Sequence, residues 1–234
     1  MTRADVCAVA CAELFRGDGE ILASPMGLLP SLGARLARLT FEPDLLISDG
    51  EALLLGADLS TVEGWLPYRK VFDVVAHGTR HVVMGANQLD RHGNQNISCI
   101  GDHARPTRQL LGFRGAPGNT VNHRTSYWVP RHSPRTFVPA VDVVSGVGYG
   151  RDGGRYHDVY RVVTDLAVLD FGADDHTMRL VSVHPGVDPD DIAAATGFPL
   201  DTSGAGTTRT PTEDEVRVLD TLDPKGLRQR EVPS

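Results

Sequence analysis

Two carboxylates follow a short apolar run and are the side chains of this 234-residue chain best placed to do chemistry. The run 45–47 predicts a buried strand, which ends in the small-residue turn Ser48-Asp49-Gly50-Glu51. In open α/β sheets, ligands bind at the carboxyl ends of strands. A carboxylate there acts as a nucleophile, as a general base, or only as a turn residue. Asp49 and Glu51 are therefore the candidate catalytic residues.

A glycine-rich segment, residues 112–119, is the second candidate. Its sequence, Gly-Phe-Arg-Gly-Ala-Pro-Gly-Asn, exposes backbone N–H groups and lets a ligand approach closely. Such N–H groups stabilise the oxyanion that forms on a reacting carbonyl. Gly115, Gly118 and the backbone of Asn119 are the candidate donors, and a plain irregular loop is the equal alternative.

Other chemistries find less support. The segment 148–153 matches Gly-x-Gly-x-x-Gly, but strand-like residues follow where a dinucleotide site needs a helix, so a hairpin loop is predicted. Cys7 and Cys11 share a face of a predicted helix without the two further ligands of a zinc site, so we predict small core residues and no metal. The nine histidines come with no Gly-x-Ser-x-Gly elbow, which leaves a serine-hydrolase triad without support.

Charge and composition exclude several classes of partner. The formal net charge of −7 argues against nucleic-acid binding and against a membrane-surface role, because both usually need a basic face. No stretch approaches the ~20 apolar residues that span a bilayer. The first residues carry charges and lack a cleavage pattern, so they do not form a signal peptide. We expect a cytoplasmic protein.

Alternating helices and strands must position the candidate segments. Helical patterns over 2–15 and 25–39 alternate with strands at 20–23 and 45–48, which predicts an α/β sheet with helical crossovers. The second half favours antiparallel strands in close succession, at 141–144, 159–163, 166–171 and 178–183. A capping box at 210–213 opens a helix to about residue 222, and a last polar strand follows. We predict one domain over 1–234, an open mixed sheet, and a C-terminal helix and strand extension at residues 205–234.

Four segments in this order resemble the β subunit of family I CoA-transferases. The resemblance covers roughly residues 5 to 200, and its motifs are the glycine- and asparagine-containing segment 83–96, the strand 164–168, and the proline-glycine and threonine-glycine-phenylalanine-proline segments at 184–187 and 196–199. It implies the open α/β fold of that family, a partner α subunit of similar fold in an α2β2 heterotetramer, and an active site between the two chains. It also implies acyl-CoA substrates, with CoA as part of the substrate and no permanently bound cofactor. Asn87, Gly115, Gly118 and Asn119 are the expected substrate- and CoA-binding residues.

The turn at Asp49 departs from the family pattern. Typical members carry serine-glutamate-asparagine-glycine, whose glutamate forms a thioester with CoA, whereas this chain has Ser48-Asp49-Gly50-Glu51. An aspartate is one methylene shorter, and a displacement of ~1 Å can cost ~10²-fold in rate. A set-back carboxylate leaves room for water and suits general-base catalysis.

This departure resembles the steroid-ring-degrading hydrolase branch of the family. That resemblance implies hydrolysis of a carbon–carbon bond in a cyclic β-keto acyl-CoA during cholesterol catabolism, with the base in this chain or in the partner. Two alternatives stay open. One is a CoA-transferase with Asp49 or Glu51 as nucleophile, and the other is a non-catalytic subunit that completes the partner's pocket.

Overall fold

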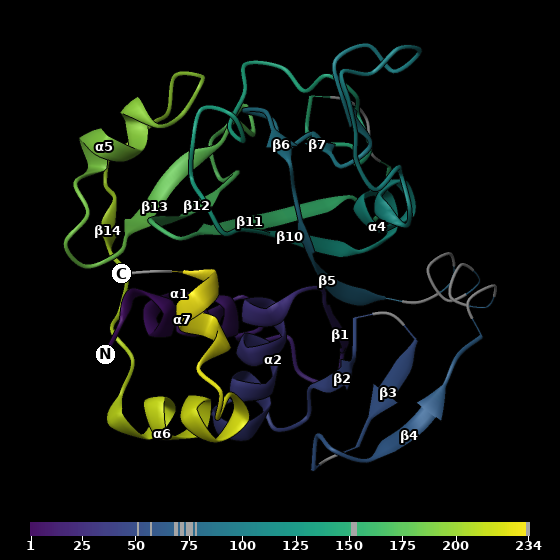
Figure 1. Ribbon diagram of the computed structural model, residues 1–234, viewed down its shortest axis with the longest axis vertical. Helices are drawn as coiled ribbons and strands as arrows, with labels where there is room; N and C mark the ends of the chain where they lie inside the picture. The colour runs from purple at the N-terminus through teal and green to yellow at the C-terminus, as the bar shows by residue number, and fades with distance from the viewer. Residues whose placement is uncertain are drawn as a thin grey trace.

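The computed structural model describes residues 1–50, 52–56, 58–67, 70, 73, 77, 79–150 and 154–232. The strands of the large sheet are β1 (Leu22–Pro25), β2 (Leu46–Ser48), β3 (Leu53–Leu55), β4 (Val62–Trp65), β5 (Arg80–Gly85), β10 (Arg124–Val129), β11 (Asp158–Thr164), β12 (Ala167–Asp170), β13 (Arg179–Val183) and β14 (Gly206–Thr207). Within the described residues, these ten strands lie in the order β14-β13-β12-β11-β10-β5-β1-β2-β3-β4 (Figure 1). Two small antiparallel pairs join β6 (Gln88–Leu89) to β7 (Gln95–Asn96), and β8 (Cys99–Ile100) to β9 (Arg108–Gln109).

The centre of the sheet is parallel and its sides are antiparallel. The five strands β11, β10, β5, β1 and β2 pair in parallel. Strands β3 and β4 on one side, and β12 and β13 on the other, pair antiparallel to their neighbours, and β14 returns to a parallel pairing at the edge. Parallel strands need crossovers, which helices supply. The predicted α/β class, with its open mixed sheet and antiparallel strands in the second half, is confirmed.

Helices cover the two faces unequally. Helices α1 (Arg3–Glu13), α2 (Leu28–Thr40), α6 (Glu213–Leu222) and α7 (Leu227–Glu231) pack on one face, and the short helices α4 (Ala116–Asn122) and α5 (Pro189–Ala194) lie on the other (Figure 1). Each face has its own cluster of buried apolar side chains. Strand β5 serves both clusters, because successive side chains point to opposite faces. Val83 packs under the long helices, whereas Val82 and Met84 pack on the side of α4.

Small side chains allow α1 and α2 to pack closely. Cys7 and Cys11 are free and fully buried in α1, as predicted for small core residues. A Cβ on Gly33 of α2 would lie only 2.7 Å from the Cβ of Cys11. Glycine is therefore required at this crossing. The sequence also predicts the start of α1, where Thr2 and Asp5 form a capping box.

Three local predictions are wrong. The segment 141–144 is irregular and not a strand, because the Asp142 carboxylate accepts hydrogen bonds from the Gln88 side chain and the Gly101 N–H. Half of the glycine-rich loop 112–119 is the start of α4, where Pro117 occupies a first-turn position that needs no N–H donor. The last polar strand is helix α7. It begins with the Asp223 carboxylate accepting from the N–H groups of Leu227 and Arg228.

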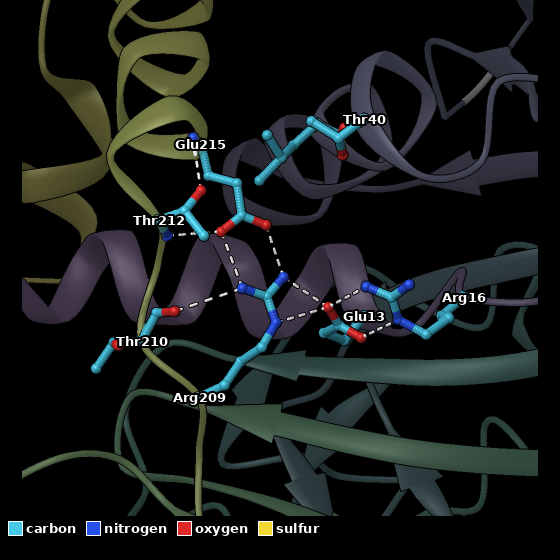
Figure 2. Close-up of polar contacts among 8 residues, drawn as sticks. Glu13, Arg16, Thr40, Arg209, Thr210, Thr212 and Glu215 are labelled. Atoms are coloured by element: carbon cyan, nitrogen blue, oxygen red, sulfur yellow. Dashed lines mark hydrogen bonds and ion pairs between the residues drawn. The ribbon is translucent and has the colours of Figure 1, made fainter.

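An arginine network holds the C-terminal segment against α1. The Arg209 guanidinium lies between the carboxylates of Glu13 in α1, at 2.6 Å, and Glu215 in α6, at 2.7 Å (Figure 2). Glu215 also completes a capping box with Thr212, two residues later than the box that the sequence predicts. Helix α7 also packs against α1, where Arg228 Nε lies 2.8 Å from Asp5 Oδ1 (Figure 1).

Candidate active site

A cavity of about 760 Å³ opens beside the carboxyl ends of the central strands. Such a volume is typical of sites for small molecules. Its walls come from the turns after β1, β2 and β5, from the end of β10 and from the start of α4. The lining is mostly apolar, with Met26, Met84, Ala86, Ile97, Leu111, Ala116, Trp128 and Pro130, and its polar members are Asp49, Arg80, Asn87, Arg114 and Asn119. Four of the six predicted site residues line this one cavity: Asp49, Asn87, Gly115 and Asn119.

The Asp49 turn is held by its own carboxylate. Asp49 Oδ1 accepts hydrogen bonds from the N–H groups of Ala52 at 2.8 Å and Leu53 at 3.0 Å, and the Asp49 N–H donates to the carbonyl of Leu53 at 2.9 Å. The side chain is exposed at the cavity. Asp49 therefore shapes the turn and also presents a carboxylate to the site. Glu51, the other candidate, lies outside the described residues.

Gly50 fixes the direction of this turn. Its φ is +89°, and a Cβ there would lie 2.5 Å from the carbonyl oxygen of Pro25. Only glycine fits both the backbone angle and this close approach. The Gly50 N–H donates to Ser48 Oγ at 3.2 Å, and Ser48 Oγ lies 3.2 Å from Ser24 Oγ of β1, so the carboxyl ends of β1 and β2 form one wall.

The other predicted residues are distributed around the α4 side. Asn87 follows β5, and its N–H donates to the carbonyl of Asn96 across the small β6–β7 hairpin. Gly115 is the N-cap of α4 and lines the cavity, whereas Gly118 lies within α4 and is not a lining residue. The Asn119 N–H donates to the carbonyl of Gly115 at 2.9 Å. The Asn119 N–H is thus engaged inside the helix, which does not favour it as an oxyanion donor, and its predicted role stays a prediction.

Arg80 is a charged residue that lines the cavity and that the sequence did not indicate. It begins β5, is only 6% exposed, and shares the face of β5 that carries Met84. Its Nη2 donates to Asn119 Oδ1 at 2.9 Å and its Nη1 donates to Ser24 Oγ at 3.3 Å. Burial lowers the pKa of this guanidinium from its usual value. The available signal in the sequence was a charged residue directly before the predicted strand 81–85. Charged residues that flank strands are ordinarily exposed to solvent, so this signal did not point to a buried site.

A Ser-His-Asp geometry exists in the chain but lies away from the cavity. His81 Nδ1 is 2.6 Å from Asp18 Oδ2, and His81 Nε2 is 2.9 Å from Ser126 Oγ. The serine and histidine are fully buried, and neither lines this cavity or the smaller one beside Asp18. A nucleophile needs access to its substrate, so this triad joins strands and does not catalyse acyl transfer.

The described residues offer no ready metal centre. No group of three or more histidine, cysteine, aspartate or glutamate side chains among them is arranged to hold a metal ion. No helix in the described part of the chain is both long and apolar enough to cross a bilayer.

Comparison with known proteins places the chain among its relatives. It is 57% identical over 245 residues to the cholesterol ring-cleaving hydrolase IpdB subunit of Rhodococcus jostii RHA1, with 99% of this chain and 96% of the relative covered. The chain belongs to the IpdB family. The crystal structure of IpdAB from the same organism superimposes on this IpdB-family chain with a TM-score of 0.95 over 100% of this chain and 99% of that one. No protein-family model matches the sequence.

A more distant structure shows the wider fold. Glutaconate CoA-transferase from Acidaminococcus fermentans is 24% identical and has a TM-score of 0.82, with 94% of each chain covered. The IpdB-family chain therefore has the family I CoA-transferase fold, as the four sequence motifs imply. Within that fold it has an aspartate, at position 49, on the turn that lines the cavity.

Proposed function

We propose that this chain is the β subunit of a heteromeric CoA-thioester hydrolase that opens a cyclic β-keto acyl-CoA in steroid ring catabolism. The observation that carries the proposal is the full-length identity of 57% with a cholesterol ring-cleaving hydrolase subunit. The relative's solved structure is an IpdAB complex, which supports an α-type partner for this chain. An α2β2 assembly is the stoichiometry we propose. The mostly apolar lining of the cavity suits a ring-derived acyl group.

The reaction adds water across a carbon–carbon bond. A base removes a proton from water, the hydroxide oxygen bonds to the ring ketone carbon, and the bond from that carbon to the α-carbon breaks. The electron pair moves to the thioester as an enolate, the α-carbon is then protonated, and the former ketone becomes a carboxylate. Asp49, Glu51 or a residue of the partner is the proposed base, and CoA enters only as part of the substrate.

The set of substrate contacts is also a proposal. Asn87, Gly115 and the Asn119 side chain line the cavity and are the groups we assign to the acyl-CoA. Gly118 lies within α4 next to Asn119 and does not line the cavity, and we keep it in the proposed set as part of this helix. A cytoplasmic location completes the proposal, and its support is that Cys7, Cys11 and Cys99 are all free thiols.

Isotope labelling tests the reaction class. The chain is co-purified with its α-type subunit and incubated with a cyclic β-keto acyl-CoA in H₂¹⁸O. We expect one ¹⁸O atom in the new carboxylate and an intact CoA thioester in the ring-opened product. Transfer of CoA to an added carboxylic acid would identify a transferase instead.

Trapping separates the two chemistries a second way. Hydroxylamine or borohydride converts a glutamyl- or aspartyl-CoA thioester into a modified peptide. We expect peptides containing Asp49 and Glu51 to stay unmodified after incubation with substrate. A modified peptide at either position contradicts the hydrolase proposal and supports a covalent transferase.

A further inference from the structure

Arg80 is a buried cation that lacks an acidic partner among the described residues. Its two hydrogen bonds within the described part of the chain go to the neutral oxygens of Asn119 and Ser24. Its Nε is buried without any hydrogen-bond partner. A guanidinium has five N–H donors, so most of its capacity is unused. Burying a charge without an opposite charge is costly, and proteins normally avoid it.

The other buried arginine among the described residues, Arg228, has carboxylate partners. Arg228 is 2% exposed and forms ion pairs with Asp5, Asp220 and Asp223. Arg80 is comparably buried, yet among the described residues it has no ion pair and it lines the cavity. The difference indicates that the missing anion comes from outside the described chain, through the cavity.

The Arg80 guanidinium is also held in one orientation. Asn119 is 2% exposed, accepts from Arg80 through Oδ1, and donates through Nδ2 to the Met84 sulfur at 3.3 Å. Ser24 is 1% exposed and fixes the other Nη group. A guanidinium that is held by two buried neutral oxygens is preorganised, so binding of an anion costs little conformational entropy.

We propose that Arg80, oriented by Ser24 and Asn119, is an anion site that binds a carboxylate carried by the apolar acyl part of the substrate. The planar guanidinium matches the two oxygens of a carboxylate. The cavity lining, which includes Met84, Ile97 and Ala116, is mostly apolar, and it therefore suits an anion that is attached to an apolar skeleton. The substrate class narrows to acyl-CoA thioesters with a second, free carboxylate. The identification of the ligand as substrate rests on the proposed function, whereas the anion site itself does not.

A matched pair of small probes tests the site without turnover. Cyclohexanecarboxylate and cyclohexanecarboxamide have the same shape and differ in charge. Ligand-detected NMR at pH 7.5 measures both affinities for the co-purified complex. We expect the carboxylate to bind at least ~10-fold more tightly, as a charge-assisted contact with arginine implies. Equal affinities would overturn the proposal. They would mean that no free anion site exists at Arg80, as when a carboxylate of the partner chain already occupies it.

Two variants test whether Arg80 is the residue that distinguishes the charged carboxylate from the neutral amide. Arg80→Met removes the cation, and Asn119→Asp places an internal carboxylate at the same distance from Arg80 without changing side-chain size. In both variants we expect the ratio of the affinities for the carboxylate and the carboxamide to fall to ~2-fold or less. Asn119→Asp should not lower the thermal midpoint, because the buried charges are then paired. Retained preference in Asn119→Asp would contradict the proposal.

Charge-matched controls lie outside the cavity lining. Asn122→Asp adds the same charge to the same helix, and Arg108→Gln removes an exposed arginine. Both controls should keep the ~10-fold preference, and its loss in either would show a general charge effect and overturn the assignment to Arg80.

Kinetics distinguishes a substrate carboxylate from an oxyanion formed during reaction. Ground-state binding predicts that Arg80→Met raises KM for a carboxylate-bearing thioester with kcat changed less than ~3-fold. A fall in kcat alone, with the probe preference intact, would overturn the proposal. A complex that prefers the acid probe but hydrolyses no cyclic β-keto thioester refutes the proposed function and leaves the site standing. Hydrolysis of the thioester by a complex that does not prefer the acid probe would refute the anion site and leave the proposed function standing.

Discussion

Asp49 completes its own turn and also presents a carboxylate to the cavity, and two substitutions separate these roles. Asp49→Asn keeps an oxygen acceptor for the N–H groups of Ala52 and Leu53 but removes the charge. If the carboxylate is the general base, turnover should fall by ~10²-fold or more at nearly unchanged stability. Asp49→Ala also removes the turn hydrogen bonds and should cost a further ~1–2 kcal/mol of unfolding free energy. Both are measured as kcat and thermal midpoint of the assembled complex.

The opposite outcome is informative at this position. Unchanged turnover in Asp49→Asn with intact assembly would move the base to Glu51 or to the partner chain. Unchanged turnover in Asp49→Ala and Glu51→Ala alike would leave this chain as a scaffold that completes its partner's pocket.

Two buried histidines make stability depend on pH. Burial lowers the pKa of His132 and of His184 to about 4. Because the unfolded pKa is higher, near ~6.5, the unfolded chain binds more protons as pH falls. Stability is therefore complete above about pH 6.5 and is lost as pH falls towards 4, by about 2 kcal/mol per histidine between pH 7.5 and 5. Thermal midpoints of the complex at pH 7.5 and 5.0 measure the loss.

Neutral glutamines test this source of acid sensitivity. His184 Nε2 donates to the Thr164 carbonyl, and its Nδ1 contacts Thr208 Oγ1, contacts that a glutamine can partly reproduce. His184→Gln should show a smaller loss between the two pH values than the parent protein. The exposed His103→Gln should leave the loss unchanged. An undiminished loss in His184→Gln would assign acid sensitivity to other groups.

At the scale of elements, helix α7 depends on a buried ion-pair cluster. Arg228 lies 2.8 Å from Asp5 of α1 and also pairs with Asp223, and all three side chains are almost fully buried. Arg228→Met leaves these two carboxylates without their cation and should cost about 3 kcal/mol. For a chain of this length the thermal midpoint should fall by roughly 6–12 °C.

The matched control for this cluster lies on the same helix. Arg230 is exposed, so Arg230→Met should change the midpoint by less than ~2 °C. Equal effects of the two substitutions would show that α7 is held by apolar contacts, such as those of Val232, and not by Arg228.

At the scale of the whole molecule, the cavity wall is expected to be completed by a second chain. The relative's structure is a complex, and large apolar side chains at this end, Leu111 at 70% and Trp65 at 68%, are exposed. Expressed alone, the chain should show less than ~1% of the turnover of the co-expressed complex, because one half of the site is missing. Activity assays with light scattering measure this, and an active, monodisperse monomer would contradict it.

The sequence by itself determined the class of fold, the family and the strand end beside which the cavity lies. Hydrophobic periodicity and capping residues report local structure, so α1, α2 and the strand before Asp49 were predictable from short windows. Four motifs in order pointed to the CoA-transferase family. The carboxyl-end rule for strands then located Asp49 at the cavity.

Only the tertiary structure decided where the Arg80 side chain lies and what the glycine-rich segment becomes. Whether a buried cation is paired depends on residues distant in sequence, here Ser24 and Asn119, and no local pattern encodes that. Likewise α4 and α7 are short helices held by contacts with distant residues, which override weak local preferences. A short window of sequence contains both a strand and the polar residues that follow it, so candidate residues at strand ends can be predicted locally. The charge balance of a cavity depends on residues that only the folded chain brings together.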